Sequence, residues 1–335
     1  MSVPIAFVIC TEPGRLEKQS LILAESIRKF AGQLKDTPIY SFHPRRGTPI
    51  APETIARFES LGVNHQQVPL NIDYHDYYLA NKPLVCAYAE RTIDTEILVF
   101  LDSDKCFFAE PTEFLLPEEY NVGLRVEYGR GIGSTGVADV QDEYWQQLYR
   151  ALGVKSERFV CTPIGNKKIR AYWNSGMIAV RTNAGIFQAW KENFERVMQL
   201  QIIPKQGNYM IEQSTLSVTV CAMDEPVFTF SPNYSYPLPL HNRLSPEFRL
   251  DSFDRLVSIH YFDMFYYRNW QKQQLNKLKD IDRNSANYRW LVQTISDYDL
   301  DYKPMFDKYI FKLKRIEKRL RQFNININLS GAIGR

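Results

Sequence analysis

Two carboxylates, Asp102 and Asp104, follow directly on the apolar run 97–101. An unbroken run of β-branched, aromatic and aliphatic residues is typical of a strand buried on both faces. Residues i and i+2 of an extended chain point to the same side, so the two carboxylates would lie together and repel each other. A divalent cation relieves that repulsion, because hard cations take oxygen ligands and also bind phosphate. The pattern predicts a metal–phosphate site at the carboxyl end of a buried strand.

The same spacing of aspartates occurs at three other places: Asp280/Asp282, Asp297/Asp299 and Asp299/Asp301. No apolar strand precedes any of these pairs, and their polar surroundings are typical of solvated helices or loops. The strand context therefore distinguishes Asp102 and Asp104, rather than the pattern itself. The alternative is that Asp102 and Asp104 cap a turn or the next helix, as aspartate commonly does.

The segments before this site alternate between strand and helix patterns. Strands are predicted at 4–11, 38–42, 63–70 and 96–101, and helices at 16–30, 52–61 and 82–93. This order predicts an α/β fold with a Rossmann-like, mostly parallel sheet and helices on both faces. Ligands of such sheets gather at the carboxyl ends of the strands, where Thr11, Glu12 and the two aspartates stand.

The second half of the sequence is less regular. Strands are predicted at 122–128, 178–181 and 257–262, and helices at 139–152, 187–200 and 214–221. His260 lies in the last of these strands and could ligate a metal, although a lone histidine is more often a hydrogen-bonded core residue. Residues 131–136 match G-x-G-x-x-G, but no βαβ unit follows them, so a surface loop is favoured over a dinucleotide fingerprint.

The composition excludes several classes of protein. A net charge of +3 over 335 residues does not indicate a nucleic-acid binder. The five scattered cysteines form no zinc motif, and buried free thiols are the simplest account of them. No apolar stretch approaches the ~20 residues of a membrane span, and 5–10 is too short for a signal peptide. We expect a cytoplasmic protein.

The segment 303–321 combines an apolar stripe at i+3/i+4 spacing with a basic face. A basic amphipathic helix of this kind can lie on an anionic membrane surface, here the inner face of a membrane. The alternative is a C-terminal helix that docks on the domain or on a partner subunit, with its basic face solvated.

Four motifs in this order resemble those of GT-A-fold glycosyltransferases, and are most similar to the family 8 type, which uses nucleotide-diphospho-sugars. They are Val99–Asp104, Tyr172–Ile178, Glu212-Gln213 and Ile259–Tyr261. The resemblance implies a GT-A-like domain over 1–270, with its nucleotide-binding half at about 1–128 and its acceptor half at about 129–270. A helical, basic extension over 271–335 would follow.

The resemblance also implies roles for individual residues. Mn²⁺ or Mg²⁺ would be held by Asp102, Asp104 and His260, and would bridge the diphosphate of the donor. Donor contacts would come from Thr11, Glu12, Lys82, Asp102 and Ser103. Catalytic residues would be Asn174, Glu212 and Gln213. The family's Gly and Lys-Pro-Trp after the histidine are missing here, and Arg268 is a candidate substitute.

The predicted function is metal-dependent transfer of a sugar from a nucleotide-diphosphate-sugar, with a UDP-sugar favoured, to a hydroxyl of a glycan or glycolipid. The resemblance favours retention of configuration, with Gln213 and Asn174 near the anomeric carbon. If the enzyme inverts, Glu212 is the natural general base. Sugar-1-phosphate nucleotidyl transfer needs a Gly-rich, Arg-containing loop, for which 11–15 is too sparse. A non-catalytic carbohydrate-binding or scaffold protein on the same fold is the other alternative.

Overall fold

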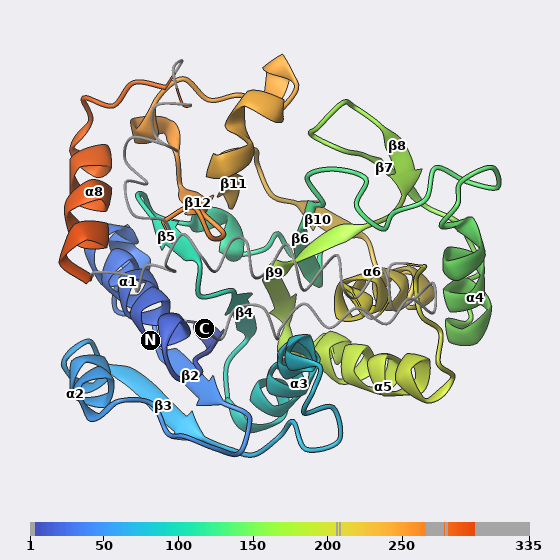
Figure 1. Ribbon diagram of the computed structural model, residues 1–335, viewed down its shortest axis with the longest axis horizontal. Coiled ribbons are helices and arrows are strands. Elements are labelled where there is room, and N and C mark those ends of the chain that lie inside the picture. The colour runs from blue at the N-terminus through green and yellow to red at the C-terminus, as the bar shows by residue number, and fades with distance from the viewer. Residues whose placement is uncertain (1–3, 206, 208, 266–277, 279–280, 299–335) are drawn as a thin grey trace, which may run out of the picture.

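The computed structural model describes residues 4–298, apart from 206, 208, 266–277 and 279–280 (Figure 1). Arg268 and the basic segment 303–321 lie outside these residues, so their predicted roles stay predictions. Within the described part of the chain, no helix is long and apolar enough to cross a membrane.

The centre of the fold is a seven-stranded sheet in the order β10-β6-β9-β4-β1-β2-β3 (Figure 1). Its strands are β1 (Ile5–Cys10), β2 (Ile39–His43), β3 (Val63–Gln67), β4 (Ile97–Leu101), β6 (Val122–Val126), β9 (Trp173–Arg181) and β10 (Val227–Thr229). All neighbours are parallel except β9, which runs antiparallel to both β4 and β6. The predicted mostly parallel sheet is confirmed.

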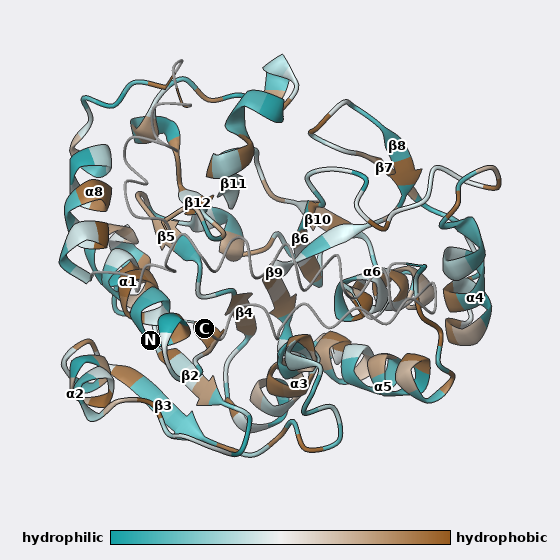
Figure 2. Cartoon of the chain, viewed as in Figure 1, coloured by the Kyte–Doolittle hydropathy of each residue, from teal (hydrophilic) through white to brown (hydrophobic). Residues whose placement is uncertain are grey.

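Helices cover both faces of this sheet, as predicted. On one face lie α1 (Arg15–Phe30) and α2 (Pro52–Ser60). On the other lie α3 (Asn81–Thr92), α5 (Ile186–Gln199) and α6 (Ile211–Ala222). Strand β4 is buried throughout because its alternate side chains enter the two cores: Val99 packs with α1, and Phe100 packs with α3. Figure 2 shows the resulting concentration of apolar residues on β4 and β9.

A second, three-stranded sheet lies beside the carboxyl end of β4. It contains β5 (Lys105–Phe107), β11 (Tyr236–Pro237) and β12 (Ser258–His260), and β12 runs antiparallel to β5. This pairing sets His260 opposite Lys105, the residue that follows Asp104. The sequence predicted β12 but missed β5 and β11, because strands of two or three residues carry too little periodicity to be recognised.

The remaining elements lie at the edges of the molecule. They are α4 (Asp142–Leu152), the hairpin of β7 (Phe159–Cys161) and β8 (Lys168–Arg170), and α8 (Ala286–Tyr298). Helix α8 lies along α1 (Figure 1), where Trp290 packs edge-on against Phe30. The five cysteines are free thiols. Cys86, Cys106 and Cys221 are buried, as predicted, whereas Cys10 is half-buried and Cys161 is exposed.

Several predicted elements differ from the structure in their extent. Strand β9 begins at Trp173 rather than 178, and α6 begins at Ile211 rather than 214. The glycine-rich segment 131–136 is a loop, as expected, but Ile132 and Ser134 are buried in it. The hydroxyl of Ser134 donates a hydrogen bond to Asp142 at the start of α4, which ties the loop down.

Candidate active site

Asp102, Asp104 and His260 come together beyond the carboxyl end of β4. One ligand atom from each residue lies within 4.8 Å of the others. His260 Nε2 is 3.2 Å from the Asp104 carboxylate, although the two residues are 156 positions apart. The predicted convergence of these three side chains is therefore present in the structure, brought about by the pairing of β12 with β5.

The hydrogen bonds of the imidazole suit a metal ligand. Tyr128 Oη donates to the carbonyl of Ser235 at 2.8 Å, so it accepts a hydrogen bond from His260 Nδ1, 3.1 Å away. The protonated nitrogen is then Nδ1, and the lone pair of Nε2 faces Asp104. Metal-binding histidines are fixed in this way by a hydrogen bond at their other nitrogen.

Asp104 also has a free coordination position. Its Oδ1 is buried and has no hydrogen-bond partner among the described residues. A buried oxygen without a partner is costly unless a ligand satisfies it. Two carboxylates and one neutral imidazole form a donor set that Mn²⁺ or Mg²⁺ accepts, so the residues present fit a divalent cation.

Two lysines balance the charge of the aspartates: Lys105 is buried and Lys82 is half-buried. Lys82 Nζ lies 2.8 Å from Asp102 Oδ2. Burial would lower the pKa of Lys82, but Asp102 and Glu212 outweigh it and raise that pKa above its ordinary value. Lys105 donates to Ser235 Oγ at 2.8 Å, and burial lowers the pKa of Lys105 to about 8. Lys82 is therefore the firmly charged counter-ion of this site.

The carboxylate of Asp102 fits beside β9 because residue 176 is a glycine. Because β9 is antiparallel to β4, the start of β9 lies beside the end of β4, and the Asp102 N–H donates to the Gly176 carbonyl at 2.9 Å. A Cβ atom on Gly176 would collide with Asp102 Oδ2. The glycine of the Trp173–Gly176 motif is therefore a spatial requirement of the Asp102 carboxylate.

Two predicted amide residues meet on a carboxylate that the sequence did not single out. Asn174 Nδ2 and Gln213 Nε2 each donate to Glu127 Oε2 at 2.9 Å. Gln213 Oε1 accepts from the backbone N–H of Ser175 at 3.0 Å, and Asn174 Oδ1 accepts from that of Gly176 at 3.0 Å. Glu127 directly follows the apolar strand β6, the same signal that marked Asp102 after β4.

Glu212 is fully buried at the start of α6. Its Oε2 accepts from Tyr77 Oη at 2.5 Å, and Oε1 accepts from Ser175 Oγ at 3.4 Å. Tyr77 Oη also accepts from the backbone N–H of Ile211, so it ties the loop before α3 to the beginning of α6. Burial raises the pKa of Glu212, against the opposing charge of Lys82.

The predicted donor contacts that follow β1 and β4 differ in accessibility. Thr11 is fully buried and bonds to the hydroxyls of Ser20 and Ser41. Ser103 Oγ donates to Gln19 of α1 at 3.4 Å. Neither hydroxyl faces open space, whereas Glu12 lines a pocket.

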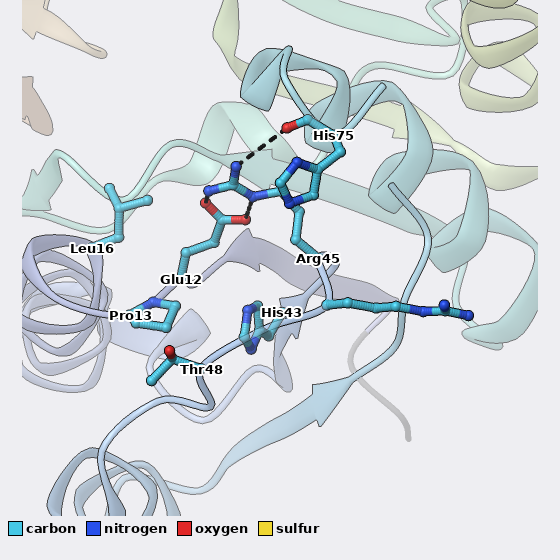
Figure 3. A pocket seen from close by; sticks show the side chains of 8 residues that line it. Glu12, Pro13, Leu16, His43, Arg45, Thr48 and His75 are labelled. Atoms are coloured by element: carbon cyan, nitrogen blue, oxygen red, sulfur yellow. Dashed lines mark hydrogen bonds and ion pairs between the residues drawn. The ribbon is translucent and has the colours of Figure 1, made fainter. Parts of the chain in front are cut away.

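That pocket has a volume of about 310 Å³ and lies at the carboxyl ends of β1 and β2 (Figure 3). Its lining includes Glu12, Leu16, His43, Arg45, Thr48 and His75. The guanidinium of Arg45 binds both carboxylate oxygens of Glu12, and Asn81 Nδ2 donates to the same carboxylate at 3.0 Å. Since Asn81 precedes Lys82, one turn of α3 connects the pocket to the aspartates.

Residues 7–224 match the family profile of the Rhodobacterales glycosyltransferase domain. The chain belongs to this glycosyltransferase family. The matched range contains both aspartates, Asn174 and the Glu212-Gln213 pair, but ends before His260. No curated protein is significantly similar to the chain in sequence.

The chain is similar to several solved glycosyltransferase structures. The apo structure of the bifunctional glycosyltransferase WbbM has a TM-score of 0.53 at 13% identity, over 93% of this chain and 52% of that one. The chain thus spans about half the length of WbbM. Apo mouse xyloside xylosyltransferase 1 has a TM-score of 0.48 at 10% identity, over 77% and 97% of the two chains. An active-site mutant of LgtC has a TM-score of 0.47 at 12% identity, over 87% of this chain and 95% of that one.

The mixed sheet flanked by helices is that of GT-A-like glycosyltransferases, which confirms the fold class implied by the sequence. The closer resemblance to family 8 stays a prediction.

Proposed function

We propose that this glycosyltransferase is metal-dependent and moves a sugar from a nucleotide-diphosphate-sugar, most favourably a UDP-sugar, to a hydroxyl group of a glycan or glycolipid. The observation that carries the proposal is the convergence of Asp102, Asp104 and His260 in a chain of this family. Retention of configuration remains a prediction from the family 8 resemblance, as does a cytoplasmic location. The anomeric configuration of the product, read by NMR, tests the first of these.

The residues around the metal site support this chemistry. A bound divalent cation supplies Lewis-acid stabilisation of the charge that develops on a leaving diphosphate. Lys82 adds a second positive charge beside Asp102, with its Nζ 2.8 Å from Asp102 Oδ2. Tyr128 holds the neutral His260 with Nε2 toward Asp104.

The pocket at Glu12 and Arg45 is placed to take the nucleoside of the same donor. It lies at the ends of β1 and β2, and β1 is the direct neighbour of β4. Adjacent strands are about 4.8 Å apart, so the strand that ends at the pocket lies directly beside the strand that ends at the aspartates. This arrangement suits a nucleoside in the pocket and its diphosphate at the cation.

A thermal-shift panel of UDP-, GDP- and dTDP-sugars, with and without Mn²⁺, tests the proposal. We expect stabilisation by one nucleotide class that requires Mn²⁺, and its loss in Asp104→Asn. Stabilisation without turnover of any sugar would favour the non-catalytic carbohydrate-binding alternative. No response to any donor would refute the donor assignment.

A further inference from the structure

Four polar side chains lie beside the metal site on the side of β6 and α6, and they differ in how far a substrate can reach them. Glu212 is 0% exposed, Gln213 is 3% exposed and Asn174 is 7% exposed. Glu127 is the partly exposed member of the group. A substrate that approaches this side of the site therefore meets Glu127 first.

The hydrogen bonds lead to the same residue. Both polar ends of the Asn174 and Gln213 amides are occupied by bonds inside the protein, to Glu127 on one side and to the backbone N–H groups of β9 on the other. Glu212 is occupied by Tyr77 and Ser175. The two amides converge on a single carboxylate oxygen of Glu127, Oε2. They hold the carboxylate in one orientation and leave its other oxygen, Oε1, outside this pair of bonds.

Glu127 is also close to the reacting groups of the proposed site. The next residue, Tyr128, bonds to His260, and the charge of Lys105 is near enough to act on the Glu127 carboxylate. Asn174 lies two residues from Gly176, which contacts Asp102. Glu127 is thus linked to the metal ligands by two short chains of contacts, through Tyr128 to His260 and through Asn174 and Gly176 to Asp102.

We propose that Glu127 is a catalytic residue that binds the acceptor, with Oε1 accepting the hydrogen bond of the hydroxyl that attacks the donor sugar. The acceptor oxygen forms the new bond to the anomeric carbon while the bond from that carbon to the diphosphate breaks. The nucleoside diphosphate leaves, and the hydroxyl proton passes to Glu127 Oε1. The inference rests on the proposed function and names the residue that orients the second substrate. A carboxylate fixed by two amides costs little reorganisation when the hydroxyl binds, and hydrogen bonds to an ionised acceptor are the stronger kind.

The substitution Glu127→Gln tests this with little disturbance of the fold. The Asn174 and Gln213 amides donate, so they select the oxygen of the new amide and direct its NH₂ group toward the acceptor. The bonds from Asn174 and Gln213 are kept, while an acceptor of the substrate's hydrogen bond becomes a donor. Glu118→Gln is the matched control, because it removes the same charge from an exposed position.

The measurements separate acceptor binding from donor binding. Transfer from the donor that stabilises the wild type is followed with Mn²⁺, to water and to a panel of p-nitrophenyl glycosides, and donor affinity is measured by calorimetry. For Glu127→Gln we expect roughly a 10- to 100-fold loss of transfer to both kinds of acceptor. Donor affinity and the melting temperature should stay at the wild-type values, and Glu118→Gln should behave as wild type throughout.

Two results for the variant would overturn the inference and leave the proposed function intact. One is transfer at the wild-type rate. The other is an equal loss of donor affinity, which would make Glu127 a residue that shapes the donor site. If the wild type binds and transfers none of the UDP-, GDP- or dTDP-sugars, the proposed function itself fails, and the role of Glu127 fails with it.

Discussion

Tyr128→Phe tests whether His260 must be held in one orientation to bind the metal, because the variant keeps the histidine but removes its hydrogen-bond partner. The variant keeps a buried aromatic ring of nearly the same shape but removes the hydroxyl that accepts from His260 Nδ1 and donates to Ser235. The imidazole then loses the partner that keeps its proton on Nδ1. With that constraint gone, a proton on Nε2 competes with the cation for the lone pair that faces Asp104.

The size of the effect follows from the kind of bond removed. Residues that orient a metal ligand through its other side typically change metal affinity by about 10- to 100-fold, which is about 1.4 to 2.8 kcal/mol. The Ser235 carbonyl also loses a hydrogen bond, so the free energy of unfolding should fall by about 1 to 3 kcal/mol. The affinity change should exceed anything that general destabilisation causes in a protein that remains folded.

Mn²⁺ titration by calorimetry, with urea denaturation alongside, measures both effects. Tyr236→Phe is the matched control, because Tyr236 is also fully buried and its hydroxyl lies 2.5 Å from Nδ1 of another histidine, His241. The control should lose stability and keep its Mn²⁺ affinity. If Tyr128→Phe binds Mn²⁺ within twofold of wild type, the bond from Tyr128 does not prepare His260 as a ligand, and the reasoning is refuted.

Further predictions concern the carboxylates of the site. Asp102→Asn and Asp104→Asn should each abolish donor turnover and weaken Mn²⁺-dependent nucleotide binding in calorimetry; full activity in either variant would contradict the metal site. Gly176→Ala should push its Cβ against Asp102 and lower the free energy of unfolding, measured in urea, by about 1 to 3 kcal/mol. It should also weaken Mn²⁺ binding in the same calorimetric titrations. Tyr77→Phe should leave the buried carboxylate of Glu212 without its shortest bond and lower the free energy of unfolding by about 1 to 3 kcal/mol in urea, and an unchanged midpoint would show that the bond is not needed. Removal of divalent ions by EDTA should cancel the donor-induced thermal shift, and added Mn²⁺ should restore it.

The first half of the fold was predictable because its elements are long and strongly patterned. Strand β4 is five consecutive apolar residues buried on both faces, and α1 presents an apolar stripe to the sheet. Such elements are specified by local sequence. The short strands β5 and β11 form because the chain pairs with β12, which comes from a distant segment, and this long-range pairing leaves no periodic signature in the sequence.

The candidate site was only partly predictable for the same reason. Asp102 and Asp104 could be recognised from the strand before them. His260 could be recognised only as a possible ligand in a predicted strand. Its place beside the aspartates, like that of the Glu212-Gln213 pair, was reached through resemblance, since it depends on tertiary contacts. Glu127 was passed over although it directly follows β6 in the structure, because the strand was predicted to extend to 128 and Glu127 was therefore taken as part of it.

The direction of β9 explains why these distant segments form one site. A strand of nine residues spans about 30 Å, so in a parallel β9 the Trp173–Gly176 motif would lie at the edge of the sheet opposite the aspartates. The antiparallel direction delivers the start of β9 between the ends of β4 and β6, next to Asp102 on one side and Glu127 on the other. Because side chains alternate along a strand, a shift of one residue in this register would turn Asn174 to the other face of the sheet. The register of β9 therefore determines whether the metal ligands and the acceptor carboxylate face the same substrate.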